Sequence, residues 1–107
     1  MALDEGRFAA LADRTLDRLM TGIEAGCGDR AEAELEAGIL TVELEDGATY
    51  VLNKHAPMRQ LWLASPVSGA WHFAYDDAAR TWRSTRGAET LDEILARELR
   101  ISLADES

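Results

Sequence analysis

Residues 31–54, AEAELEAGILTVELEDGATYVLNK, decide the fold that the sequence predicts. Apolar and polar residues alternate on both sides of Gly38, and a period of two is typical of a strand with one buried and one solvated face. Asp46-Gly47 predicts a hairpin turn of type I′, which needs positive φ at both central residues. The stretch therefore predicts three consecutive antiparallel strands, at residues 31–37, 39–45 and 48–54.

Three further short strands are predicted downstream. Pro57 ends the third strand, because proline cannot donate to a strand ladder. The turn-forming segment 65–69, SPVSG, then separates two of the next three strands, which we expect at residues 60–64, 71–75 and 81–84. Consecutive strands joined by tight turns imply one antiparallel sheet.

The segments that flank the strands have helical periodicity. Residues 4–25 repeat apolar side chains at steps of three and four, with Asp4 as the N-cap and glycines at the end. A capping box at 90–93, TLDE, predicts a second helix over 90–100. The buried stripe of this helix comprises Leu91, Ile94, Leu95 and Leu99.

Both apolar stripes should cover the same face of the sheet. The predicted fold class is therefore α+β, a two-layer sandwich with two helices packed on one face of a five- to six-stranded antiparallel sheet. We expect one domain over residues 1–107, since no linker or repeat interrupts it. Ile101 and Leu103 of the tail are predicted to fold back onto the domain.

The charge of the chain limits the classes of partner. Lys+Arg 11 against Asp+Glu 20 gives a formal net charge of -9, which argues against nucleic acid and against an anionic membrane surface. Metal ions or basic protein surfaces fit better, although such charge often serves only solubility. No segment approaches the ~20 apolar residues of a membrane span, and the N-terminus does not look like a targeting signal. We expect a soluble and, if the source is bacterial, cytoplasmic protein.

The single cysteine, Cys27, excludes an internal disulfide and suits a reducing compartment. Its position between Gly26 and Gly28 predicts a loop. No nucleophile elbow, phosphate loop or HExxH motif is present, so we expect a non-catalytic protein. By spacing alone, His55 and His72 are more often plain surface residues than ligands.

Acidic side chains on the first helix are the first candidate site. At ~100° per residue, Asp13, Asp17 and Glu24 lie within ~40° of one another around the helix. Their axial steps of ~6 and ~10 Å prevent a closed cage around one ion, but each carboxylate suits a hydrated hard cation. Asp29 and Glu32 extend this acidic ridge toward the first strand, with Glu34 and Glu36 further along. The alternative is an ordinary solvated helix face.

Trp62 is the second candidate site. If Leu61 and Leu63 face the helices, Trp62 stands exposed on the open face of the sheet. An exposed tryptophan there is typical of an interface hot spot. The alternative is a strand buried on both faces. The residues expected to surround Trp62 are Asn53, Lys54, Arg59 and Gln60.

The segment TYVLNKHAPMRQLWLASPVSG, residues 49–69, resembles the signature of the frataxin family, in which a strand ends in Asn-Lys and a proline turn precedes Gln-x-Trp-Leu-(Ser/Ala)-Ser-Pro. Similarity extends over about nine tenths of the chain, including the LADRTLD run at 11–17 and Trp82. The resemblance implies the two-layer sandwich derived above. It also implies ferrous or ferric iron at the acidic ridge and docking onto the cysteine desulfurase and scaffold protein that build iron–sulfur clusters.

Carried over by position, the resemblance assigns two sets of residues. The metal set is Asp13, Asp17, Glu24, Asp29 and Glu32, and the partner-binding set is Asn53, Lys54, Gln60 and Trp62. The ridge is less acidic than in many relatives, because Arg14 and Arg18 interrupt it, and this argues against iron storage.

The function expected from the sequence is that of an iron-binding regulator of the desulfurase–scaffold complex, with iron donation as a further role. The alternatives are a ferroxidase or iron-storage protein, or an acidic interaction module without metal. We expect a monomer, or an oligomer induced by metal. His55 and His72 stand where relatives often have glutamine and a basic residue, so either could adjust docking or metal contact.

Overall fold

The computed structural model describes residues 3–103 of the 107-residue chain. Two α-helices flank six β-strands, and a short 3₁₀ turn, Gly28–Arg30, connects the first helix to the first strand. The elements are α1 (Glu5–Cys27), β1 (Ala31–Glu36), β2 (Ile39–Leu44), β3 (Thr49–His55), β4 (Gln60–Ser65), β5 (Gly69–Asp76), β6 (Thr81–Ser84) and α2 (Leu91–Leu99). This order confirms the predicted succession of elements.

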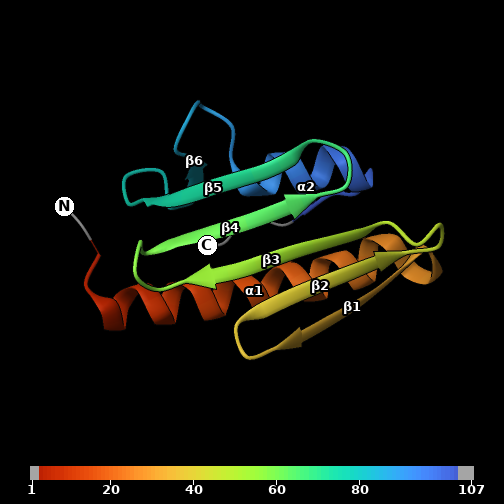
Figure 1. Cartoon of the computed structure of the whole chain (residues 1–107), viewed down its shortest axis with the longest axis horizontal. Helices are drawn as coiled ribbons and strands as arrows, with labels where there is room; N and C mark the ends of the chain where they lie inside the picture. Colours follow the sequence, from red (N-terminus) through yellow and green to blue (C-terminus); the bar gives the residue numbers. More distant parts are fainter. Residues whose placement is uncertain (1–2, 104–107) are drawn as a thin grey trace.

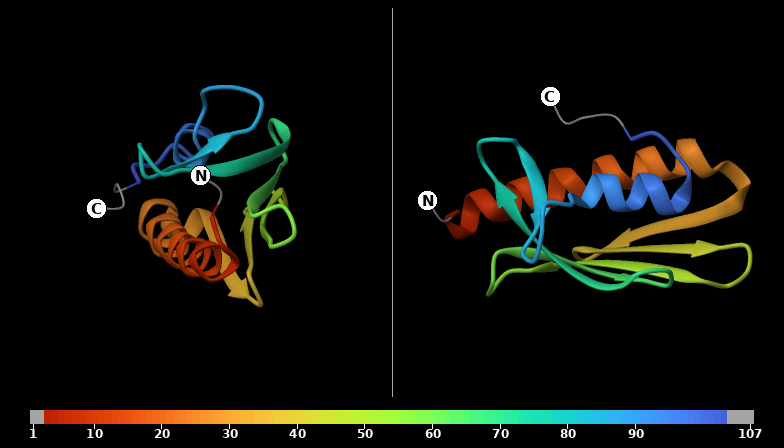
Figure 2. Two further views of the ribbon diagram at one scale, coloured as in Figure 1. Left: turned by 90° about the vertical axis from the view of Figure 1, so that its left-hand side faces the viewer. Right: turned by 90° about the horizontal axis from the view of Figure 1, so that it is seen from above.

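The six strands form one antiparallel sheet in the order β1-β2-β3-β4-β5-β6. Both helices run along the same side of the sheet, as the view from above shows (Figure 1, Figure 2). The fold class predicted from the sequence is thus confirmed, and no helix of the described residues covers the opposite face of the sheet. Within residues 3–103, neither helix is long and apolar enough to cross a membrane.

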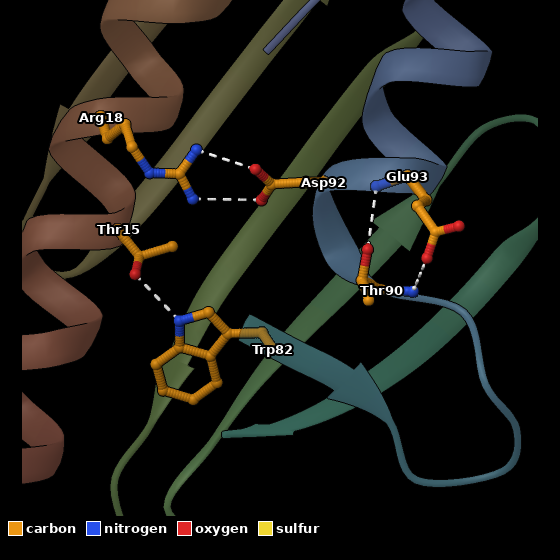
Figure 3. Close-up of polar contacts among 6 residues, drawn as sticks. All are labelled: Thr15, Arg18, Trp82, Thr90, Asp92 and Glu93. Atoms are coloured by element: carbon orange, nitrogen blue, oxygen red, sulfur yellow. Dashed lines mark hydrogen bonds and ion pairs between the residues drawn. The ribbon is translucent and has the colours of Figure 1, made fainter. Parts of the chain in front are cut away.

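Polar groups hold the helix layer and the sheet together at defined points. In Figure 3, the Trp82 indole N–H donates to Thr15 Oγ1 at 2.8 Å, and both residues are buried. Arg18 on α1 binds Asp92 on α2 through two hydrogen bonds, at 2.8 and 3.1 Å. The predicted capping box at Thr90 is present in both directions. The Arg18–Asp92 pair joins α1 to α2, and the Trp82–Thr15 hydrogen bond joins α1 to β6.

A second polar cluster joins α2 to the far ends of the strands. Tyr50 Oη donates to Glu98 Oε1 at 3.0 Å, and Ser65 Oγ donates to the same oxygen at 2.6 Å. Ser68 Oγ donates to the other oxygen of Glu98. Burial, followed by the hydrogen bond to the Glu98 carboxylate, raises the pKa of Tyr50 to about 12.

Two turns differ from the prediction. Type I′ geometry was assigned to Asp46-Gly47, but only Gly47 of that pair has positive φ. Gly47 N–H donates to Leu44 O and Leu44 N–H donates to Ala48 O, so three residues close this hairpin as a type I turn with a glycine bulge. Positive φ at two adjacent residues occurs instead between β1 and β2, at Ala37 (54°) and Gly38 (77°).

The loop predicted around Cys27 was also wrong. Cys27 is the last residue of α1 and is buried. The helix continues through Gly26, and Gly28, whose φ is 55°, is its C-cap. Glycine is needed at position 26 for packing, since an added Cβ would lie 2.8 Å from Ile101. Ile101 and Leu103 pack against the core as predicted, while residues 104–107 lie outside the described part.

Candidate functional site: the open sheet face and the acidic edge

Trp62 lies on the open face of the sheet, between two histidines. Its neighbours in the strand, Leu61 and Leu63, are buried beneath the helices, so the alternation places Trp62 on the opposite side. The His55 ring stacks on the indole at 3.7 Å between centroids, with 8° between the planes. The His72 ring stacks at 4.2 Å and 9°. We call these three residues the ring stack.

The ring stack corrects one expectation about Trp62. The sequence predicted an exposed indole, whereas Trp62 is half-buried because imidazole rings cover both of its flat faces. The edge of the indole is fixed as well, since Nε1 donates to Gln60 Oε1 at 2.9 Å. Trp62 is therefore held in one orientation, which lowers the entropy that a partner must remove on binding.

Strand register places the other predicted docking residues. Asn53 pairs directly with Trp62, and Trp62 pairs with His72. Gln60 pairs with His55, so it also lies on the open face. Three of the four residues of the predicted docking set, Asn53, Gln60 and Trp62, are thus brought together.

Lys54 lies on the other side, and the placement expected from the sequence was wrong. It pairs with the buried Leu61, which puts it on the helix-covered face. Its ammonium group contacts Asp13 on α1 at 2.8 Å between Nζ and Oδ1. Lys54 was grouped with Trp62 although it has the same strand parity as Leu52, so the sequence contained the signal for the correct side. Its role in partner binding stays a prediction.

The acidic residues divide into two groups in the folded protein. Asp13 and Asp17 line one hollow beside Gly38 and Leu35, next to the ammonium of Lys54. Glu24 and Glu32 line a separate open hollow, together with Glu34 and Glu43. Asp29 lines a third, smaller hollow that also includes Glu32 and Glu43. The predicted ridge is therefore interrupted by a cation at one end and continues onto the sheet at the other.

Glu43 was missed by the sequence reasoning. It pairs directly across the strands with Glu32, and both side chains are exposed. Two like charges directly opposite each other destabilise a sheet, so a cation near this pair would relieve repulsion. The alternation in 39–45, with Glu43 outward, was the available signal. Among residues 3–103, no three His, Cys, Asp or Glu side chains converge closely enough to enclose an ion.

Comparisons with known proteins identify the family of the chain and agree with its fold. A family model described as the frataxin-like domain matches residues 1–105. The iron-sulfur cluster assembly protein CyaY of Pseudomonas fluorescens (strain Pf0-1) is 39% identical over 97 residues, which cover 91% of this chain and 86% of the relative. The mitochondrial frataxin homolog of Schizosaccharomyces pombe is 38% identical over 101 residues, covering 91% of this chain and 64% of that protein.

Solved structures show the same arrangement. Frataxin from Psychromonas ingrahamii superimposes with a TM-score of 0.77 at 21% identity, covering 94% of this chain and 96% of that one, and supports the fold alone. Trimeric frataxin from the yeast Saccharomyces cerevisiae, complexed with ferrous iron, gives a TM-score of 0.69 at 36% identity, covering 94% and 86% of the two chains. The protein belongs to the frataxin family.

Proposed function

We propose that this protein acts in iron–sulfur cluster assembly as a non-catalytic, single-domain regulator. In this proposal it docks through the open sheet face onto a cysteine desulfurase and its scaffold protein, and it binds iron weakly at the acidic edge. It works in the cytoplasm as a monomer, or as an oligomer when metal is bound. Donation of iron to the scaffold protein is a further part of the proposed role.

The observation that supports docking most strongly is the ring stack in the middle of an uncovered sheet face. A large aromatic side chain held rigidly on a surface provides contact area at low entropic cost. Asn53 and Gln60 beside it supply amide donors and acceptors. Binding hot spots of protein interfaces are enriched in tryptophan and cluster near the centre of the interface.

The docking proposal is tested with the cognate desulfurase and scaffold, separately and together. We expect the wild-type protein to bind the complex and to change the rate of sulfide production by the desulfurase. Isothermal titration calorimetry measures the binding, and a sulfide assay measures the modulation. Absence of binding to the desulfurase, the scaffold and their complex would contradict the proposal.

The donor chemistry of the acidic edge fits iron as a weakly held ligand. Carboxylate oxygens are hard donors that suit Fe²⁺ and Fe³⁺, and Glu24, Glu32 and Glu43 surround one open hollow. Because no closed set of ligands forms within residues 3–103, water would complete most of the coordination shell. We expect a dissociation constant in the micromolar range or weaker.

Paired charge-neutral variants test which group of carboxylates holds iron. Because Lys54 already compensates Asp13, the double variant Glu24→Gln/Glu32→Gln should lose more iron-induced NMR line broadening than Asp13→Asn/Asp17→Asn. The two variants remove the same number of charges, so each is the control for the other. Unchanged broadening in both would exclude the acidic edge as the iron site.

A further inference from the structure

The open face of the sheet is ordered by charge from one edge to the other. The outward residues of β1 are all glutamates, Glu32, Glu34 and Glu36. Strand pairing continues one of these rows through Ile39, Asn53 and Trp62 to His72 on β5. Beyond β5, strand pairing places Arg83 on this face, and Arg86, in the turn after β6, lines a hollow at the same edge. The face therefore has an acidic end, an aromatic and amide centre, and a basic end.

The basic end contains a hollow that adjoins the ring stack. Ala70, His72, Thr85 and Arg86 line it, and no carboxylate is among these residues. Thr85 is connected to this strand because its N–H donates to His72 O at 2.9 Å. The hollow lies directly beside Trp62, since the His72 ring stacks on the indole.

Arg86 is held at the edge of the sheet beside this hollow. Its Nη2 donates to Ala70 O at 2.9 Å, and its guanidinium carbon lies 5.9 Å from the centre of the Trp71 ring, within the range of a cation–π contact. A guanidinium has five N–H donors, and no ion pair between Arg86 and a carboxylate exists among residues 3–103. The neighbouring Arg83 differs, because Asp76 compensates it at 3.0 Å.

We propose that the hollow formed by His72, Thr85 and Arg86 binds a carboxylate side chain of the protein partner, and so fixes the orientation of that partner on the open face. This inference rests on the proposed docking function. The partner surface that fits is basic opposite β1 and β2, accommodates the ring stack at its centre, and presents an aspartate or glutamate to Arg86.

The sign of one mutational effect separates this proposal from general electrostatic attraction. The protein has a formal net charge of -9, and a reversal of one arginine to glutamate makes that charge more negative by two. If only overall attraction to a basic partner operated, the reversal would strengthen binding wherever it was made. A carboxylate bound by Arg86 predicts weaker binding for a reversal at Arg86 alone.

The experiment compares Arg86→Glu with Arg97→Glu, which makes the same charge change on the exposed side of α2. Binding to the desulfurase, the scaffold and their complex is measured by surface plasmon resonance at low and high salt. We expect Arg86→Glu to weaken binding about tenfold and Arg86→Gln about threefold. Arg97→Glu should bind as well as wild type or slightly more tightly. The loss at Arg86 should shrink at high salt.

Three outcomes have defined meanings. Weaker binding for both Arg86 variants, with unchanged unfolding curves and an unaffected Arg97→Glu control, supports the carboxylate site. Equal behaviour of Arg86→Glu and Arg97→Glu, in a protein whose Trp62→Ala variant binds poorly, overturns the carboxylate site and leaves docking intact. No binding by wild type overturns both proposals.

Discussion

Trp82 and Trp62 lie on opposite faces of the same sheet, and their environments differ in kind. Trp82 is 2% exposed and packs beneath α1, with edge-on ring contacts to Phe8 and Tyr75. Its indole N–H is bound to a buried hydroxyl of the other layer. Trp62 is half-buried, stacks on His55 and His72, and donates to Gln60, all of which belong to the sheet.

The difference separates residues that hold the fold from residues that are available to a partner. Removing Trp82 leaves a cavity and an unpaired hydroxyl between the two layers, so the free energy of unfolding decreases. Removing Trp62 opens no interior space, because no second layer covers it. Substitution of Trp62 should instead weaken binding to the partner.

Trp82→Ala should have the largest effect on stability. We expect a loss of about 3–5 kcal/mol in the free energy of unfolding, from the cavity and the lost transfer energy. Urea denaturation followed by circular dichroism measures it. Trp82→Phe serves as the milder variant if Trp82→Ala does not fold. A loss below about 1 kcal/mol would mean that the helix layer can close over the gap.

The Tyr50 hydroxyl should make the helix-covered side sensitive to alkali. Because burial and Glu98 raise the pKa of Tyr50 to about 12, from about 10 in the unfolded chain, the folded state retains a proton that the unfolded state loses. This stabilising contribution is complete below pH 10 and is lost as the pH rises to about 12.

The comparison of wild type with Tyr50→Phe isolates that contribution, since other groups titrate equally in both. The phenylalanine variant should be about 1 kcal/mol less stable at pH 7, where it lacks one hydrogen bond. Its stability should then fall less steeply between pH 10 and 12, as measured by urea unfolding at each pH. Parallel curves of stability against pH for the two proteins over that range would refute a raised pKa of Tyr50.

Glu43→Gln should give the smallest effect and the opposite sign. Removal of one charge from the Glu32–Glu43 pair should stabilise the free protein by about 0.2–1 kcal/mol, and added salt should reduce that gain. Thermal unfolding at two ionic strengths measures it. Glu45→Gln, an exposed change in the neighbouring turn that lines the same acidic hollow but has no carboxylate paired directly opposite, is the matched control and should give a smaller gain. A destabilised Glu43→Gln would mean that this carboxylate makes a favourable contact.

Most of the fold could be predicted because period and capping are local signals. The switch from a helical repeat to alternation after Gly28 marks the start of the sheet, and the Thr90 box marks the start of α2. The geometry of the turns was harder to predict from the sequence. Whether two or three residues close a hairpin depends on strand twist and pairing, so type I′ backbone geometry was expected at Asp46-Gly47 and positive φ at both central residues occurs at Ala37-Gly38.

The sequence predicted which residues belong to the candidate site better than it predicted the contacts between them. Parity alone places Trp62 on the open face, and the same rule applied to Lys54 would have placed it beside α1. The ring stack needs more, because His55 and His72 reach Trp62 only through the register of two different hairpins. That register cannot be read from spacing alone, so the sequence did not place the two histidines against Trp62, and Trp62 was expected to be exposed.

The most direct test measures unfolding free energy and partner dissociation in parallel for Trp62→Ala and Trp82→Phe. The comparison predicts that Trp62→Ala dissociates from the desulfurase–scaffold complex faster, with a loss of about 2 kcal/mol or more of binding free energy, while its unfolding free energy falls by less. Trp82→Phe should show the reverse, reduced stability with near wild-type dissociation under conditions where it is folded. A Trp62→Ala protein that binds normally, or that unfolds while Trp82→Phe remains stable, would contradict the assignment of the open face to docking.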